Sequence, residues 1–168
     1  MIRALAITVS NRAAAGVYAD SSGPVLAAAL RATGCQVDGP LVIPDGSVVE
    51  EALRDAVAAG YDVVVTTGGT GLTQGDLTPE MTRVVIDREI PGIAEAIRAA
   101  GAGAGVPSAV LSRGLAGLAG STLIVNLPGS TGGVRDGMAV LSGVLAHAVD
   151  QVRGGDHPRQ EDLDAPIE

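Results

Sequence analysis

Apolar positions follow two different periods along the first part of the chain. Uninterrupted apolar and β-branched runs predict strands over 2–9, 35–43 and 61–67. Helical spacing of apolar residues predicts helices over 24–33 and after Ser47. Strands and helices that alternate at these intervals favour right-handed βαβ crossovers and a mainly parallel sheet.

Local signals predict where several helices begin and break. Ser47, with Glu50 three residues later, is a capping box, so we expect Ser47 to cap the helix that follows it. A further helix is expected from Pro79. Pro91 and the glycines of 101–105 interrupt that stretch, which predicts a kinked or two-part helix between residues 80 and 100.

The last third of the chain predicts a hairpin and a helix. Two short β-rich runs, 109–118 and 121–127, flank Gly120 and suit a β-hairpin. An apolar stripe over 134–152 predicts one long final helix. The fold class expected is therefore α/β: three layers, α/β/α, around a mainly parallel sheet, with a short β-hairpin toward the C-terminal half.

The chain length of 168 residues suits one domain, expected over residues 1–153. The acidic, proline-containing segment 154–168 lacks apolar periodicity, so we expect a mobile tail there. No apolar run reaches the roughly eighteen residues of a membrane helix, and the first residues lead directly into a strand. These features predict a cytoplasmic protein without membrane contact.

Charge and composition exclude several classes of function. A net charge of −8 argues against a surface that binds nucleic acid or anionic lipid. All 11 basic residues are arginine, which excludes a Walker-A lysine and Schiff-base chemistry. Tyr18 and Tyr61 are the only aromatic residues, so a platform for stacking bases is not expected.

One segment, 66–80, has the residue types of a phosphate-binding loop. It follows the strand-like run 61–67, and an open α/β sheet places its ligands at the carboxyl ends of strands. Glycines bring backbone N–H groups close to a ligand, threonines add hydroxyls, and the helix start at Thr78 offers unpaired N–H groups to an anion. Asp76 lies inside this segment and would repel a bare phosphate, so its presence suggests a divalent cation.

Other strand ends are expected beside that segment. The loop after Val9, the turn 44–46 and the segment 126–130 should line the same crevice. Asp45 and Asp76 come from different loops, an arrangement that suits Mg²⁺ held by one or two carboxylates while substrate phosphates supply further ligands. Each aspartate also has a structural alternative, because Asp45 suits an ordinary turn and Asp76 suits a helix cap or loop acid.

Several motifs together resemble the molybdenum-cofactor biosynthesis proteins of the MogA/MoaB type, the molybdopterin adenylyltransferases. The likeness covers about residues 5 to 150. It is carried by Thr66 to Gly71, Asp76 to Glu80 and Asn126 to Ser130, with further matches at 8–12, 16–18, Asp20, 43–45, 87–92, 111–113 and 120–124.

The resemblance implies transfer of AMP from Mg·ATP to the terminal phosphate of molybdopterin, with release of pyrophosphate. It implies a MoaB/Mog-like fold, a homotrimer, and a molybdenum-insertion protein that uses the product. Asp45 and Asp76 match the acids tied to Mg²⁺ and catalysis. The chemistry of phosphate transfer calls for added positive charge, for which Arg12 and Arg113 are the candidates, with Arg135 behind them. Each arginine has a structural alternative, as a solvated side chain or as part of a trimer contact. Together with the positions argued above, the expected substrate- and phosphate-binding residues are Ser10, Arg12, Thr67, Gly68, Gly69, Thr70, Gly71, Thr78, Glu80, Arg113, Pro128, Gly129 and Ser130.

The sequence departs from the family pattern at two places, and two other functions are compatible with its motifs. Asn11 stands where many relatives carry Asp, and 130–133 lacks the usual proline, which predicts a looser turn. One rival is a nucleotide pyrophosphatase or amidohydrolase of the CinA type, although Gly-Thr-Gly replaces its more usual Gly-Leu-Gly and its second domain is missing. The other rival is a MoaB-like protein that binds molybdopterin without turnover.

Overall fold

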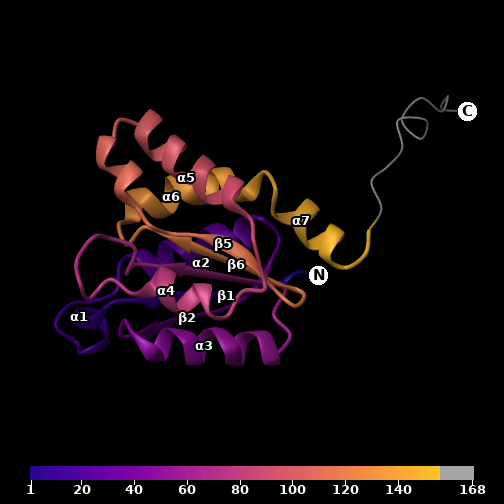
Figure 1. Ribbon diagram of the computed structural model, residues 1–168, viewed down its shortest axis with the longest axis horizontal. Helices are drawn as coiled ribbons and strands as arrows, with labels where there is room; N and C mark the ends of the chain where they lie inside the picture. Colours follow the sequence, from indigo (N-terminus) through magenta and orange to yellow (C-terminus); the bar gives the residue numbers. More distant parts are fainter. Residues whose placement is uncertain (156–168) are drawn as a thin grey trace, which may run out of the picture.

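A computed structural model describes residues 1–155 and contains one six-stranded sheet in the order β2-β1-β3-β6-β5-β4 (Figure 1). Strands β1, β2, β3 and β6 run parallel, while β5 pairs antiparallel with β6 and with β4. The strand bounds are β1 Arg3–Val9, β2 Gln36–Ile43, β3 Val63–Thr67, β4 Arg88–Glu89, β5 Ala116–Ala119 and β6 Thr122–Leu127. The predicted mainly parallel sheet and its hairpin are confirmed.

Helices cover both faces of the sheet, which confirms the three-layer α/β/α prediction (Figure 1). One face is covered by α2 Ser22–Ala32, α5 Pro91–Gly103, α6 Thr131–Ser142 and α7 Leu145–Val152. The other face is covered by α3 Ser47–Ala58 and α4 Thr78–Arg83. Two short helices, α1 Asn11–Ala14 and the 3₁₀ helix η1 Pro107–Leu111, lie in loops.

The central strands β3 and β6 are buried along their whole length. Val63 and Val65 pack into the core under α2 and α6, whereas Val64 packs into the core under α3. Buried Thr66 and Thr67, at the end of β3, are hydrogen-bonded within the protein. Because side chains alternate across a strand, a strand covered on both faces buries all its side chains, which favours a near-continuous apolar run. This burial explains the apolar run that predicted β3.

Of the kinked or two-part helix predicted between 80 and 100, the two-part form is confirmed, because α4 and α5 are separate helices. Edge strand β4, which was not predicted, lies between them. Pro91 begins α5 at its first position, where a missing N–H has no effect. The run 109–118 contributes only β5, since its first part belongs to η1. The final helix is two helices, with α6 ending at Ser142 and α7 beginning at Leu145.

The predicted capping box is also wrong. The N-cap of α3 is Gly46, at φ 103°, and no side chain caps this end of the helix. Ser47 is therefore the first helical residue. The turn before α3 needs a left-handed residue, which only glycine adopts easily, and this requirement moves the helix start back by one position.

Strand β1 lies between β2 and β3, so the chain moves one way across the sheet after β1 and the other way after β2. Helices α2 and α3, which make these two crossovers, accordingly cover opposite faces. Such a reversal opens a crevice beyond the carboxyl ends of the two strands, where ligands of α/β proteins bind. Here those ends are Val9 and Thr67.

No helix within residues 1–155 is long and apolar enough to cross a membrane. The predicted tail, 154–168, lies outside the described residues except for its first two glycines.

Candidate functional site

Two clefts open at the carboxyl edge of the sheet. The polar cleft has a volume of about 490 Å³, and the apolar cleft has a volume of about 540 Å³. The polar cleft is lined by Ser10, Arg12, Tyr18, Asp20, Asp45, Thr67 and Gly68, among others. The apolar cleft is lined by Thr70, Gly71, Leu72, Ile97, Arg98, Val106, Leu111, Pro128 and Ser130, among others. Gly69, Asp76 and Gly129 line both, so the two clefts meet at these residues.

The glycine turn that separates the clefts depends on residues without a side chain. Gly68 and Gly69 have positive φ angles of 102° and 65°. A Cβ on Gly68 would overlap the Val9 carbonyl, and one on Gly69 would overlap the side chains of Thr78 and Asp45. The N–H groups of Gly69, Thr70 and Gly71 donate to no other residue in the described chain. Gly69 lines both clefts, whereas Thr70 and Gly71 line the apolar cleft, so these N–H groups are candidates to bind an anion at or beside the junction.

Asp45 is held by backbone from two loops. Its Oδ1 accepts from the N–H of Gly46 at 2.8 Å, and its Oδ2 accepts from the N–H of Leu77 at 3.1 Å. Its own N–H donates to Asn11 Oδ1 at 2.9 Å. An aspartate at position 11 could accept the same bond, so the departure at Asn11 preserves this contact while removing a charge.

The pKa of Asp45 is raised above its ordinary value of 3.8. Burial is the largest cause, and the nearby Asp76 charge adds to it, while the N–H groups of Gly46 and Leu77 act in the opposite direction. A carboxyl group whose pKa is raised by burial, with a smaller contribution from a neighbouring carboxylate, is a candidate functional group.

Asp76 closes its own loop. Its Oδ2 accepts from the Thr73 N–H at 3.0 Å and from the Thr73 hydroxyl at 2.7 Å. Within the described residues, Oδ1 accepts no hydrogen bond, so one oxygen of this carboxylate stays available. Asp76 therefore has the structural role of a loop acid through Oδ2, while Oδ1 remains free to bind a ligand.

Two carboxylates on one cleft fit the way proteins hold Mg²⁺. The described residues contain no group of three or more His, Cys, Asp or Glu side chains able to enclose a metal ion. Mg²⁺ keeps several waters and is usually bound through one or two carboxylates together with substrate phosphates. Asp45 and Asp76 satisfy that smaller requirement, and Mg²⁺ would supply positive charge to neutralise those phosphates.

The predicted anion site at the start of α4 is occupied by the protein itself. The Leu77 N–H donates to Asp45, and the Thr78 N–H donates to the Gly69 carbonyl at 3.2 Å. Pro79 has no N–H, and Glu80 bonds its own backbone N–H. The N-terminus of α4 therefore fixes Asp45 and the glycine turn, and it is not open to phosphate. Thr78 is fully buried, and its hydroxyl lies 3.5 Å from Asp45 Oδ1.

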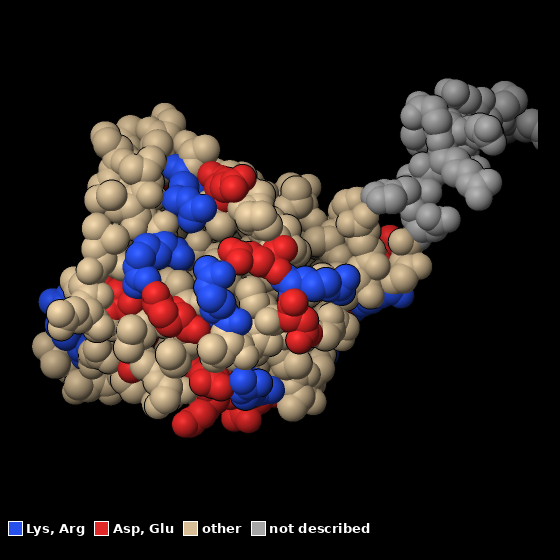
Figure 2. Space-filling view, viewed as in Figure 1, with Lys and Arg blue, Asp and Glu red and all other residues tan. Residues whose placement is uncertain are grey.

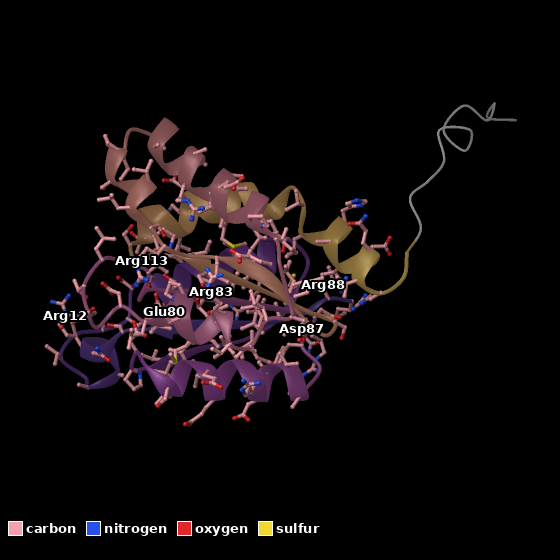
Figure 3. The ribbon with its side chains drawn as sticks, in the orientation of Figure 1. Arg12, Glu80, Arg83, Asp87, Arg88 and Arg113 are labelled. Atoms are coloured by element: carbon pink, nitrogen blue, oxygen red, sulfur yellow. The ribbon has the colours of Figure 1, made fainter. Side chains whose placement is uncertain are left out.

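Arg113 and Glu80 face each other instead of lining the clefts (Figure 3). The Arg113 guanidinium also donates to the carbonyls of Gly71 and Asp76. This contact with Arg113 holds the pKa of Glu80 below its usual range. The roles predicted for both residues as direct substrate contacts thus compete with a structural role that the sequence did not suggest.

Arg12 is exposed at the rim of the polar cleft, stacked 5.1 Å from the centre of the Tyr18 ring. The Tyr18 hydroxyl lies 3.0 Å from Ser10 Oγ, which also caps helix α1. A guanidinium on an aromatic face is oriented but keeps its N–H donors. Arg12 therefore remains suited to contact an anion in this cleft.

The segment after β6 is firmly held. Thr67 Oγ1 donates to the Pro128 carbonyl at 2.7 Å, and Ser130 Oγ caps α6 by accepting from the Gly133 N–H at 3.0 Å. Instead of the looser turn expected at 130–133, the structure has a capped helix start. A Cβ on Gly129 would lie 3.2 Å from the Gly68 Cα, so the two glycine turns lie against each other.

Sequence reasoning missed the apolar cleft and its arginine. Arg98 lines this cleft and donates to the Gly114 carbonyl at 3.0 Å and, less closely, to the Ser112 carbonyl at 3.3 Å. Helix α5 and η1 build the outer wall, and their apolar residues had no local sign that they face a cavity. The stripe on α5 would be the same for a helix packed only on the core.

An open α/β sheet with a glycine turn and two acids beside its switch point is typical of α/β proteins that bind anionic ligands. Comparison with known proteins identifies the kind. Residues 5–147 match the family model described as "Probable molybdopterin binding domain", and the chain belongs to that family.

Individual relatives agree with this assignment. The chain is similar to the molybdopterin biosynthesis Mog protein from Mycobacterium ulcerans, with 52% identity, a TM-score of 0.86, and coverage of 90% of this chain and 99% of that one. It is 34% identical to a molybdopterin adenylyltransferase from Pyrococcus furiosus over 88% of this chain and 89% of the relative.

The chain spans about half the length of some of the curated relatives it matches. The bifunctional molybdenum cofactor biosynthesis protein from Chlorobaculum tepidum is 34% identical over 92% of this chain and 50% of its own length.

Proposed function

We propose that this protein transfers AMP from ATP to the terminal phosphate of molybdopterin, with Mg²⁺ as cofactor and pyrophosphate as the second product. The observation that carries the proposal is the meeting of two clefts at Gly69, Asp76 and Gly129. A reaction between two bound molecules needs adjoining sites with the reacting groups at the junction. The family assignment and the adenylyltransferase among the relatives support this choice of substrates.

The protein itself need not take part in bond making or bond breaking in this reaction. A phosphate oxygen of the pterin attacks the α-phosphorus of ATP, a new O–P bond forms, and the bond to the β-phosphate oxygen breaks as pyrophosphate leaves. The attacking group is already anionic at neutral pH, so no general base is required. Catalysis then depends on alignment and on neutralising charge at the α-phosphate.

Each part of the site has a place in that scheme. The N–H groups of Gly69, Thr70 and Gly71 would bind phosphate oxygens at the junction. Asp45 and Asp76 would hold the cation that neutralises the phosphates, and Arg12 would add positive charge from the rim of the polar cleft. The homotrimer, the cytoplasmic location and the downstream insertion partner remain predictions; sedimentation velocity tests the first of them.

Incubation of the protein with Mg·ATP and molybdopterin separates the candidate functions. Adenylyl transfer predicts adenylylated pterin and pyrophosphate in equal amounts, neither of which forms when molybdopterin is omitted. A CinA-type hydrolase predicts nucleotide breakdown that does not require the pterin. A MoaB-like binding protein predicts retention of the pterin with no product, and either of the last two results would overturn the proposal.

A further inference from the structure

Arg113 holds the glycine-rich loop from the side away from the clefts. Its Nε donates to the Gly71 carbonyl at 2.7 Å, and its Nη2 donates to the Asp76 carbonyl. Its backbone N–H donates to the Thr70 carbonyl at 2.9 Å. One residue from the segment between η1 and β5 thus fixes both ends of the loop 70–76.

The guanidinium is itself held in place. Its Nη1 pairs with Glu80 in the first turn of α4 (Figure 3). The Arg113 side chain is only 34% exposed. An arginine fork that is hydrogen-bonded at all three of its nitrogens is far less free to turn toward a substrate than an exposed arginine. Arg113 therefore acts on the loop and does not reach the clefts that Asp76 lines.

The bonded carbonyls determine where the opposite N–H groups point. The only cis peptide in the described residues is Gly39–Pro40, so the peptides after Thr70, Gly71 and Asp76 are trans. In a trans peptide the C=O and N–H point in opposite directions. When Arg113 holds the Thr70 carbonyl on its own side, the Gly71 N–H is turned to the other side. This N–H is one of those that lack a protein acceptor.

The same geometry links Arg113 to both acids. The carbonyl of the peptide between Asp76 and Leu77 accepts from Arg113, and the N–H of that peptide donates to Asp45 Oδ2. Hydrogen bonds at the two ends of one peptide polarise it and strengthen each other. A single rigid peptide plane thus connects the guanidinium to the carboxylate of Asp45 and to the Cα of Asp76.

We propose that Arg113 is a positioning residue that sets the distance and orientation of Asp45 and Asp76 through the Asp76–Leu77 peptide, and that it contacts no substrate phosphate. This inference deepens the adenylyl-transfer proposal and rests on it for the activity measurement only. A spectroscopic measurement on the protein alone tests the inference independently.

The test compares Arg113→Lys with Arg83→Lys. Arg83 lies in the last turn of α4 and pairs with Glu89 at 3.0 Å (Figure 3). Basic and acidic side chains lie next to one another on this face of the molecule (Figure 2). Within the described residues, Arg83 donates to no carbonyl of the loop 70–76. Lysine keeps the positive charge in both variants but cannot bond two carbonyls and a carboxylate in one plane. The comparison therefore isolates the fork geometry from the charge.

We expect Arg113→Lys to lower kcat by about 10- to 100-fold while the KM for ATP changes by less than about threefold, because misplaced catalytic groups slow the chemical step more than binding. In the ¹⁵N NMR spectrum, the Leu77 amide proton should move upfield as its bond to Asp45 weakens. Arg83→Lys should leave kcat and the Leu77 amide unchanged.

Two results would overturn the inference: an unchanged Leu77 amide in Arg113→Lys, or a KM for ATP raised tenfold or more with kcat retained, which would mark Arg113 as a phosphate contact. If wild type shows no adenylyl transfer, the proposed function fails while the amide shift still decides the role of Arg113. Should Arg113→Lys not fold, Glu80→Gln keeps the guanidinium but loosens its anchor, and it must shift the Leu77 amide in the same direction.

Discussion

Gly69→Ala is the substitution that should disturb the site most directly. Gly69 lies where the two clefts meet, and a Cβ there would overlap both Thr78 Oγ1 and Asp45 Oδ2. Since Thr78 is fully buried, the Asp45 side chain is the neighbour that can move. Relief of the overlap requires a displacement of about 1 Å, because heavy atoms must separate to ordinary contact distance.

The magnitude follows from two separate effects. The positive φ of 65° costs a non-glycine residue about 1 kcal/mol, and overpacking adds about 1–3 kcal/mol. Displacing Asp45 by about 1 Å should lower kcat by about 100-fold. We therefore expect a variant that folds but loses about 2–4 kcal/mol of unfolding free energy and nearly all of its activity.

Gly60→Ala is the matched control, since Gly60 also has a positive φ, of 72°, but a Cβ there meets nothing within 4 Å. It should lose only about 1 kcal/mol and keep full activity. Urea denaturation measures the unfolding free energies, and initial rates of pyrophosphate release measure the activities. If Gly69→Ala matched Gly60→Ala in both measurements, the close approach of the glycine turn to Asp45 would have no functional meaning.

Three further predictions concern the acids and the support of the turn. Asp76→Asn keeps the side-chain shape but removes a charge, so pyrophosphate release should fall by at least about 100-fold with normal circular dichroism; wild-type rates would refute a role for this carboxylate. The pKa of Asp45 is raised from 3.8, so protonation of Asp45 stabilises the folded state. This contribution to the unfolding free energy is fully present below pH 3.8 and is lost as the pH rises through the folded-state pKa. Without metal, the unfolding free energy of wild type should therefore fall relative to that of Asp45→Asn as the pH rises above 3.8, and Mg²⁺ should restore part of the loss in wild type only; parallel curves would contradict this. Asn126→Ala removes the amide that bonds Thr66 and Thr82, each at 3.0 Å, and should cost about 2–4 kcal/mol in urea denaturation; a loss under about 1 kcal/mol would show that the network is not needed.

The elements that could be predicted were those with a clear local periodicity of apolar residues. The apolar run of β3 and the helical spacing of α2 and α3 follow from burial on both faces of a sheet, so their order alone implied a parallel sheet with a crevice beyond Val9 and Thr67. The split of the final helix and the edge strand β4 depend on tertiary packing, which the pattern does not encode.

The same distinction applies to the site. Asp45 and Asp76 could be placed on one crevice because both follow strand ends. Which N–H groups are free could not be foreseen, because the acceptor for Leu77 lies 32 residues away, and the donor to the Gly71 carbonyl lies 42 residues away. Long-range hydrogen bonds of this kind leave no periodic trace in a sequence.

The proposed reaction depends on one cation shared by Asp45 and Asp76 where the two clefts meet. Crystals grown with Mn²⁺ and a non-hydrolysable ATP analogue would reveal this cation, because the anomalous signal locates the metal. We expect a single peak that both carboxylates and the α-phosphate ligate, beside the N–H groups of Gly69 to Gly71. A bound nucleotide whose metal touches neither aspartate would contradict it.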